Sequence, residues 1–208
     1  MAGPEAKSEA AVAEGSSPPS PAPGTAKLTD LQRRLLDILR NQPEPLFALL
    51  DAARDDRVLD LLRNSGEQYQ SLYEGKQGEE LASFAPYLVQ LPKDSRLLMT
   101  LVQEGWGKSW AVYLTCSKPV TDIRKHFRHF LIVQTEDGRE LYFRFYDPRV
   151  LRLFLPTCTA DESNSFFGPV RSYLLEGEER HILLQFTSRG QGSPAKVLTL
   201  ASTQGSAT

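Results

Sequence analysis

The sequence predicts an α/β fold of the α+β type: a single compact domain in which helices flank a mixed, partly antiparallel sheet. Short apolar runs with the period of a strand alternate along the chain with segments whose apolar residues recur at helical spacing. Asp137-Gly138 lies between two strand-like runs, which is a strong hairpin signal and makes part of the sheet antiparallel. No internal repeat interrupts this alternation.

Length and composition favour one domain with tails. The chain has 208 residues, of which 40% are hydrophobic and 24% charged, as in ordinary globular proteins. Residues 1–27 are rich in Ala, Pro, Ser and Gly and contain no apolar signal-peptide core, so we expect a disordered N-terminal extension. The domain is expected over residues 28–188, followed by a flexible tail over 189–208. No apolar run is long enough to span a bilayer, which favours a cytoplasmic protein without a membrane partner.

The first half of the chain alternates helices and strands. Thr29 and Gln32 form a capping box that begins a helix ending near Asn41, before Pro43 and Pro45. The following segments are predicted as a buried strand (46–51), a helix (55–64), a strand (69–73), a loop (75–78) and a strand (88–91).

The second half continues the alternation and contains the predicted hairpin. Thr121 is a candidate N-cap for a helix that ends near Phe130. The other predicted segments are a helix (95–103), strands (109–115, 131–135 and 141–146), a helical turn (163–167), two strands (170–175 and 181–187) and a short edge strand (197–200).

The run 141–156, LYFRFYDPRVLRLFLP, is predicted to change from strand to helix at one acidic residue. Asp147 is a good N-cap, Pro148 suits the first helical position, and Pro156 ends the helix. Packing explains the apolar residues of the run. It does not explain the polar and basic side chains that crowd around the turn: Arg144, Tyr146, Arg149 and Arg152.

Gly107-Lys108-Ser109 resembles part of a phosphate-binding loop, but the rest of that motif is missing. The motif requires a glycine five residues before the Gly-Lys-Ser, and Val102 occupies that position. We therefore predict a tight helix-to-strand turn at Gly105 and Gly107. The two tryptophans that flank it, Trp106 and Trp110, would anchor a core if buried and mark a binding surface if exposed.

No group of residues has the spacing of a catalytic or metal site. His126 and His129 share a helical face, but their basic neighbours would repel a cation, so a solvated basic face is favoured. Cys116 and Cys158 fit no metal-ligand spacing and are expected to be small buried hydrophobes. The residues therefore present no catalytic constellation, and we expect no cofactor, metal or small-molecule substrate; from the residues alone, an enzyme of another mechanism stays open as an alternative.

Charge is distributed unevenly along the chain. Residues 44–81 carry nine acids and four bases, whereas residues 118–152 carry eight bases and five acids, although the net charge is only −2. Such a two-sided distribution suits docking to a protein partner. The alternative is a nucleic-acid-binding or regulatory protein. Its interface would use Arg124, Lys125, Arg128, Arg144, Arg149 and Arg152, with Tyr142 and Tyr146 as stacking platforms.

Several ordered motifs resemble those of a known family. They are FALLDAA (47–53), SLYEG (71–75), APYLV (85–89), EGWGKSW (104–110), RFYDPRVL (144–151) and FLP (154–156). The series is similar to the domain-of-unknown-function 4123 family, the adaptor chaperones of bacterial type VI secretion, over roughly residues 46–168. Within these motifs we expect a structural role for Asp51, Tyr73, Gly105, Gly107, Asp147 and Pro148.

The resemblance implies a non-catalytic cytoplasmic adaptor. Members of this family bind a toxic effector, often near its N-terminal region, and help to load it onto the spike protein without being secreted with it. Many members carry a further, variable C-terminal lobe. Only about forty residues follow Gly168 here, so that lobe is expected to be short or missing.

The predicted partner-binding residues combine arginines with aromatic side chains: Trp106, Trp110, Arg144, Tyr146, Arg149 and Arg152. Both residue classes are enriched at interface hot spots, and arginine holds carboxylates bidentately. The hypothesis is that the Arg-rich corner grips an acidic or backbone-rich segment of the client. The alternative is that Arg144 and Asp147 pair with each other while Asp147 merely caps the helix.

Overall fold

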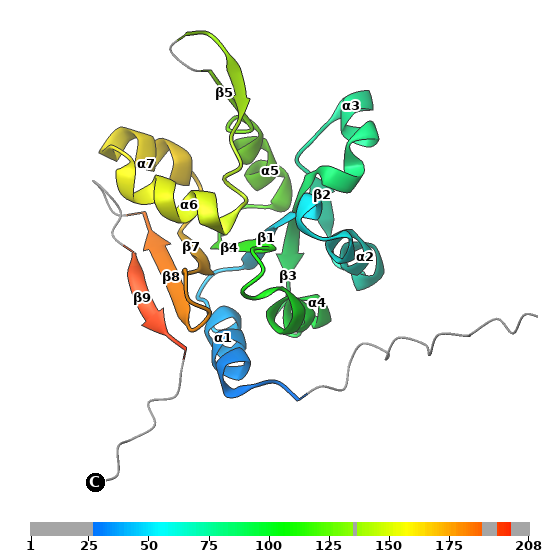
Figure 1. Cartoon of the computed structure of the whole chain (residues 1–208), viewed down its shortest axis with the longest axis vertical. Helices are drawn as coiled ribbons and strands as arrows, with labels where there is room; N and C mark the ends of the chain where they lie inside the picture. Colours follow the sequence, from blue (N-terminus) through cyan, green and yellow to red (C-terminus); the bar gives the residue numbers. More distant parts are fainter. Residues whose placement is uncertain (1–26, 135–136, 189–194, 201–208) are drawn as a thin grey trace, which may run out of the picture.

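The computed structural model describes residues 27–134, 137–188 and 195–200. Within these residues the chain forms seven α-helices and nine strands (Figure 1). The helices are α1 Asp30–Arg40, α2 Asp56–Ser65, α3 Gly75–Glu80, α4 Arg96–Thr100, α5 Val120–Arg128, α6 Pro148–Phe154 and α7 Ala160–Phe167. The strands are β1 Leu46–Asp51, β2 Tyr69–Ser71, β3 Pro86–Leu91, β4 Ala111–Thr115, β5 Ile132–Gln134, β6 Glu140–Tyr142, β7 Ser172–Glu176, β8 Ile182–Thr187 and β9 Lys196–Thr199.

Seven strands form one sheet in the order β2-β3-β1-β4-β7-β8-β9, and β5 and β6 form a separate hairpin. Every strand pair of the described residues is antiparallel, so the sheet is antiparallel throughout and not mixed, and the predicted hairpin forms outside this sheet. The α+β prediction is confirmed. The predicted edge strand near the C-terminus is also confirmed, as β9.

The sheet is covered by helices on both faces, which gives three layers. One core joins Ala48 and Leu50 of β1 to helices α1, α2 and α4, and the other joins Phe47 and Leu49 to helices α5, α6 and α7. The alternation of strand side chains between two faces therefore explains why every residue of β1 is buried. In Figure 1, α5, α6 and α7 lie toward the top of the sheet, and α1 and α4 lie toward the bottom.

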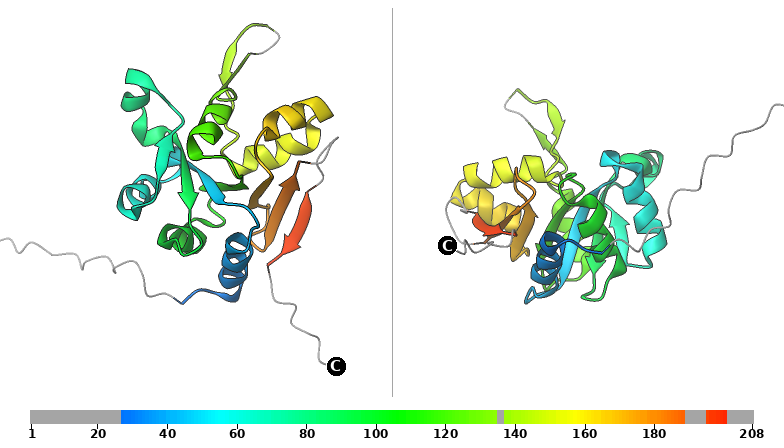
Figure 2. Two further views of the ribbon diagram at one scale, coloured as in Figure 1. Left: turned by 180° about the vertical axis from the view of Figure 1, so that it is seen from behind. Right: turned by 60° about the horizontal axis from the view of Figure 1, so that its bottom comes forward.

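The β5–β6 hairpin projects from this three-layer body. Both views in Figure 2 show it as a separate protrusion. Ile132 pairs with Tyr142 and Val133 with Leu141, and all residues of both strands are exposed. The hairpin thus contributes little to either core.

The local signals of the N-terminal half are confirmed. Thr29 and Gln32 form the capping box of α1, and the side chain of Asp55 caps α2. Gly66 ends α2 in the left-handed conformation, with φ of +72°. The capping box joins residues only three apart in the chain, which is why the sequence alone predicts it.

Three local predictions are wrong. Residues 75–78, predicted as a loop, begin α3; a Cβ on Gly78 would lie 3.0 Å from the carbonyl carbon of Tyr73, so glycine there permits close packing. Thr121 lies inside α5, whose N-cap position is Pro119. The strand predicted over 141–146 ends at Tyr142, because the next residues turn inward.

The inward turn after β6 is driven by burial. Phe145 and Tyr146 are both buried, which a half-buried strand does not allow for adjacent residues. The ring of Phe143 packs on Phe154 at 4.7 Å between centroids, and Phe145 stacks on Phe127 at 5.2 Å. The aromatic core therefore overrides the period-two pattern of the sequence.

The tail predictions fall largely outside the described residues. The N-terminal extension predicted over residues 1–27 is described only from Lys27, and Thr135 of the predicted 131–135 strand is also outside. In the predicted tail over 189–208, the structure describes residues 195–200, which contain β9.

Candidate functional site

The corner at the start of α6 forms as the sequence predicts. Asp147 is the N-cap and accepts a hydrogen bond from the backbone amide of Arg149 at 2.9 Å, and Pro148 occupies the first turn. The side chain of Arg149 also binds Asp147 through Nε and Nη2, with a shortest distance of 2.6 Å. Arg149 therefore holds the cap in place.

A second buried carboxylate, Asp51 at the end of β1, completes the corner. Its side chain is 1% exposed and lies 2.5 Å from Nη2 of Arg144, and it also accepts a hydrogen bond from the amide of Ala53. Arg144 lies 3.9 Å from Asp147, so Asp51 is its main partner. The alternative, in which Arg144 pairs with Asp147 and Asp147 caps the helix, is confirmed for the cap; the Arg144–Asp147 ion pair is present but longer than the Arg144–Asp51 pair.

Tyr146 lies beneath this corner and not on the surface. Burial raises the pKa of Tyr146, and the neighbouring Tyr73 raises that pKa further through charge and a side-chain hydrogen bond. The guanidinium of Arg144 lies 6.0 Å from the centre of the Tyr146 ring. Tyr146 and Tyr73 therefore support the corner from inside, and Tyr146 is not available to a partner in this conformation.

The Asp147 ion pair predicts a pH dependence of stability. Burial by itself would raise the pKa of Asp147, but hydrogen bonds from Arg149 and the charges of Arg149 and Arg144 outweigh it and hold that pKa below its ordinary value. A carboxyl whose pKa is depressed in the folded state stabilises the protein above its unfolded pKa, and this contribution is lost as the pH falls through the folded pKa.

We therefore expect Asp147→Asn to lower the free energy of unfolding by about 1 kcal/mol at pH 7, because Asn still caps a helix but cannot pair with half-exposed Arg149. The difference from wild type should be smaller at about pH 3, because that pH lies below the ordinary pKa of an aspartate and protonation then begins to remove the contribution of the ion pair. Urea unfolding at both pH values measures it. Asp94→Asn, at an exposed position, is the matched control. If the difference in free energy of unfolding between wild type and Asp147→Asn stayed the same at low pH, the stabilising role of the Asp147–Arg149 ion pair would be contradicted.

The turn before β4 shows whether Trp106 and Trp110 are buried or exposed. Trp110 is buried and packs on Gly105, where an added Cβ would lie 2.7 Å from the ring. Trp106 is half-buried and donates its Nε1 hydrogen to the carbonyl oxygen of Arg180 at 2.7 Å. The interpretation of both residues as an exposed aromatic pair is thus wrong, and Trp110 is a core anchor.

The same turn binds an internal carboxylate that sequence reasoning missed. Glu176 of β7 is buried and accepts hydrogen bonds from the amides of Gly107 (2.6 Å) and Ser109 (2.8 Å) and from the Ser109 hydroxyl (2.9 Å). Gly107 and Ser109 both have positive φ, +81° and +60°, which turns their amides to one side. The phosphate-loop-like sequence therefore forms an anion-binding turn that the chain itself occupies.

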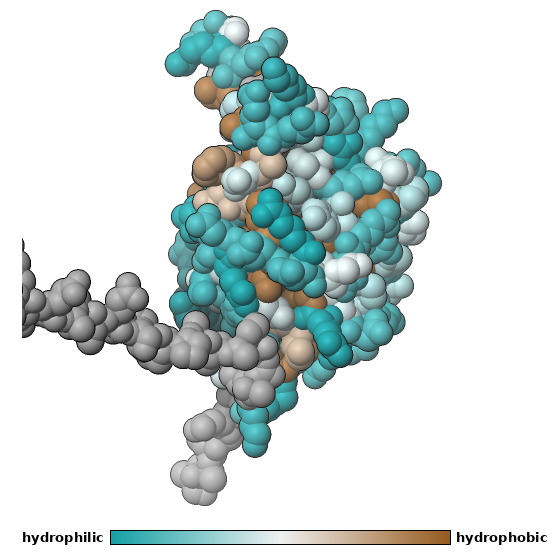
Figure 3. All heavy atoms as spheres, turned by 90° about the vertical axis from the view of Figure 1, so that its right-hand side faces the viewer, coloured by the Kyte–Doolittle hydropathy of each residue, from teal (hydrophilic) through white to brown (hydrophobic). Residues whose placement is uncertain are grey.

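Exposed apolar side chains lie on both faces of the hairpin and on the neighbouring helix α6. We call this the hairpin–α6 surface: Ile132, Val133, Leu141, Tyr142 and Leu153, all exposed. Phe143 follows the hairpin directly and contacts Phe154 of α6, so the two elements are neighbours. Figure 3 shows apolar atoms on the projecting segment below its hydrophilic tip.

Two hollows adjoin the hairpin–α6 surface. One has a volume of about 210 Å³ and is lined by Tyr73, Leu81, Ile132 and Tyr142. The other is a shallow apolar depression lined by Phe143, Val150, Leu153 and Phe154, with Arg144 and Arg149 at its edge. The sequence indicated this surface only weakly, because the hairpin carries apolar residues on both of its faces, as a buried strand does.

The arginines proposed for nucleic-acid binding are mostly paired with carboxylates. Arg124 and Arg128 bind Glu74 at 2.5 and 2.6 Å, and Arg144 and Arg149 bind the corner carboxylates. Tyr146 is buried and cannot stack on a base. This arrangement does not favour the nucleic-acid alternative.

Neither the histidines nor the cysteines form a reactive group. Nε2 of His126 lies 2.9 Å from the carbonyl oxygen of Phe166, and burial lowers the pKa of His126. Cys116 and Cys158 are buried free thiols, as predicted, and burial raises the pKa of each. Among the described residues, no three His, Cys, Asp or Glu side chains are grouped as a metal site.

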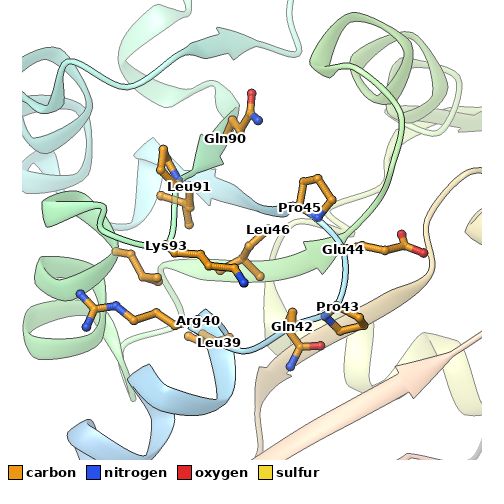
Figure 4. A pocket seen from close by; sticks show the side chains of 12 residues that line it. Leu39, Arg40, Gln42, Pro43, Glu44, Pro45, Leu46, Gln90, Leu91 and Lys93 are labelled. Carbon is orange, nitrogen blue, oxygen red and sulfur yellow. The ribbon is translucent and has the colours of Figure 1, made fainter.

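A further cavity of about 260 Å³ opens between the end of α1 and the ends of β1 and β3 (Figure 4). Its walls are mainly leucine and proline, and its charged side chains are Arg40, Glu44 and Lys93. In Figure 4, the side chains of Arg40 and Glu44 extend in opposite directions. The cavity lining contains no serine, cysteine or histidine, so it lacks the side chains of a Ser-His or Cys-His pair.

The comparisons with known proteins give one result. The family described as "Domain of unknown function (DUF4123)" matches residues 46–165, which include the Asp51–Arg144 pair and the turn at Gly107. No curated protein and no solved structure matches the chain. In the described part of the chain, no helix combines the length and apolarity needed to traverse a membrane. A match over more than half of the sequence establishes that this chain belongs to the DUF4123 family.

Proposed function

We propose that the protein is a cytoplasmic, non-catalytic adaptor chaperone that binds a type VI secretion effector through the N-terminal region of the effector and assists its loading onto the spike protein. Membership of the DUF4123 family, known in general for effector adaptors, supports this role. So does the exposed hairpin–α6 surface, whose apolar side chains suit protein binding.

The observation that carries the proposal is the exposure of large apolar side chains on the hairpin–α6 surface. Leu153 is 67% and Tyr142 57% exposed, and the hairpin is two-stranded and stands apart from the core. A two-stranded hairpin is only marginally stable alone in water, and clustered exposed apolar residues mark interaction sites. A bound client would cover these apolar side chains and stabilise the hairpin.

Arg144 and Arg149 place charge at the edge of this apolar surface. Each is partly exposed, with side-chain exposures of 44% and 45%, although each already pairs with a buried carboxylate. An arginine held in one orientation by an internal carboxylate loses less rotamer entropy when its remaining N–H groups bind a partner. The proposed client site therefore combines an apolar centre with oriented donors at its rim.

Co-expression with the effector encoded next to this gene tests the proposal. We expect the wild-type chain to co-purify with that effector, and the double variant Leu141→Ser, Leu153→Ser to retain about tenfold less of it, because a few apolar anchors dominate binding. The matched control is Phe84→Ser, Val197→Ser, which removes exposed apolar side chains elsewhere. Equal retention by both variants would place the client on another surface, and no retention by wild type would overturn the adaptor role.

A further inference from the structure

A polar cavity of about 200 Å³ lies beside the turn at Gly107. It is bounded by α6, by the end of β7 and by the segment that follows β7. Its charged lining consists of Arg149, Arg152, Glu176, Glu178 and Arg180. Three cationic and two anionic side chains thus line the cavity. Which of them already have partners within the fold determines what the cavity can bind.

Two of these charges are already satisfied within the fold. Both carboxylate oxygens of Glu176 accept hydrogen bonds from the turn, at 2.6 to 2.9 Å. Arg149 is bound to Asp147 by its Nε and Nη2 atoms. Neither group needs a partner from outside.

Arg152 and Arg180 are not satisfied in this way. Arg152 donates to the carbonyl oxygen of Gly177 at 3.1 Å and lies 3.7 Å from Glu178, whose side chain is 80% exposed. The Nε atom of Arg152 is buried and has no hydrogen-bond partner among the described residues. A buried donor without an acceptor is unfavourable, so the guanidinium of Arg152 is not fully satisfied by the fold.

Arg180 is held against the turn with its charge available. Its Nε, Cγ and Cδ atoms lie within 3.0 Å of the point where a Cβ on Gly107 would be, so only glycine leaves it that position. Its carbonyl oxygen accepts the Trp106 hydrogen bond, which anchors its backbone. In the described part of the chain, its guanidinium forms no ion pair.

From this arrangement we infer that the cavity between Arg152 and Arg180 binds a carboxylate side chain, an Asp or Glu of the client. Two guanidinium groups around a small polar hollow can supply several N–H donors to one carboxylate. The negative charges of Glu176 and Glu178 on the lining disfavour a dianionic phosphate more than a single carboxylate. The identity of the client rests on the proposed function, whereas carboxylate binding does not.

Titration of the isolated full-length chain with propionate tests carboxylate binding without any client. Propionate reproduces the glutamate side chain, and propionamide is its neutral control. We expect the arginine Nε–Hε NMR signals of Arg152 and Arg180 to shift to saturation with propionate and not with propionamide. Arg180 is exposed, and Arg180→Gln should raise the dissociation constant for propionate about tenfold. Arg96 is an exposed arginine on α4, and Arg96→Gln should leave that constant unchanged.

Two results of the titration would overturn the inference. One is a shift that does not saturate or that is the same in Arg180→Gln as in Arg96→Gln. The other is tighter binding of inorganic phosphate than of propionate, which would point to a phosphate ligand. Arg152→Gln provides a second variant, and its spectrum also assigns the Arg152 signal.

Co-purification then separates this inference from the proposed function. If Arg180→Gln retains less effector than Arg96→Gln, the carboxylate bound in the cavity belongs to the client. Equal retention of the effector by the two variants would overturn that assignment. If the wild-type chain retains no effector, the adaptor role fails, and the propionate titration alone decides whether the cavity binds carboxylates.

Discussion

Glu176→Ala is expected to lower the free energy of unfolding by about 4 kcal/mol. The substitution leaves the amides of Gly107 and Ser109 and the Ser109 hydroxyl without their acceptor. It also removes a negative charge near Arg149, whose pKa is raised mainly by the hydrogen bond to Asp147 and to a smaller extent by Glu176. Since Ser109 is held at positive φ, loss of the carboxylate removes the contacts that offset this strain.

Urea unfolding at pH 7 measures the effect of Glu176→Ala. Glu178→Ala is the matched control two residues away, because its exposed carboxylate makes only a 3.7 Å contact with Arg152. We expect the control to change the free energy of unfolding by less than about 0.5 kcal/mol. A loss below about 1 kcal/mol for Glu176→Ala would show that water replaces the carboxylate in the turn.

Phe166→Ala is expected to lower the free energy of unfolding by about 3 to 4 kcal/mol. Phe166 of α7 is buried, and its ring lies between 5.2 and 6.4 Å from those of six other aromatic residues. These are Phe127, Phe130, Phe143, Phe145, Phe154 and Tyr173. Truncation therefore leaves a cavity at the point where α5, α6, α7 and β7 meet.

Chemical unfolding and near-ultraviolet circular dichroism measure this effect, because the aromatic rings lose their fixed environment. Phe84→Ala removes the same number of atoms from a largely exposed site, and we expect it to cost less than about 0.5 kcal/mol. Phe166→Ala should also weaken effector retention, since Phe143 and Phe154 position α6 beneath the hairpin. A variant as stable as Phe84→Ala would contradict the central role of Phe166 in this core.

The sequence predicted those parts of the site that depend on neighbouring residues. Asp147 and Pro148 begin α6 as expected, because capping involves amides two or three residues away. The helix-to-strand turn at Gly105 and Gly107 was likewise predicted. The binding of the Glu176 carboxylate by this turn was not predicted, because Glu176 is 67 residues from Ser109 and no spacing rule connects them.

Exposure was the least predictable property of the proposed partner-binding residues. Trp110 and Tyr146 are buried, whereas Arg144 and Arg149 remain partly exposed. A tryptophan or tyrosine beside a turn fits a core and an interface equally well, so the neighbouring elements decide. The hairpin–α6 surface was not predicted, because its exposed apolar residues resemble those of a buried strand.

The sequence by itself determined the fold class, the capped helices, the hairpin and the family, because these depend on local periodicity, on capping over a few residues and on ordered motifs. Only the tertiary structure decided which charges meet. Arg144 pairs with Asp51 across 93 residues, and Glu176 fills the turn at Gly107. The physical reason is that a buried charge is stable only beside a partner, and the sheet brings together partners that lie far apart along the chain.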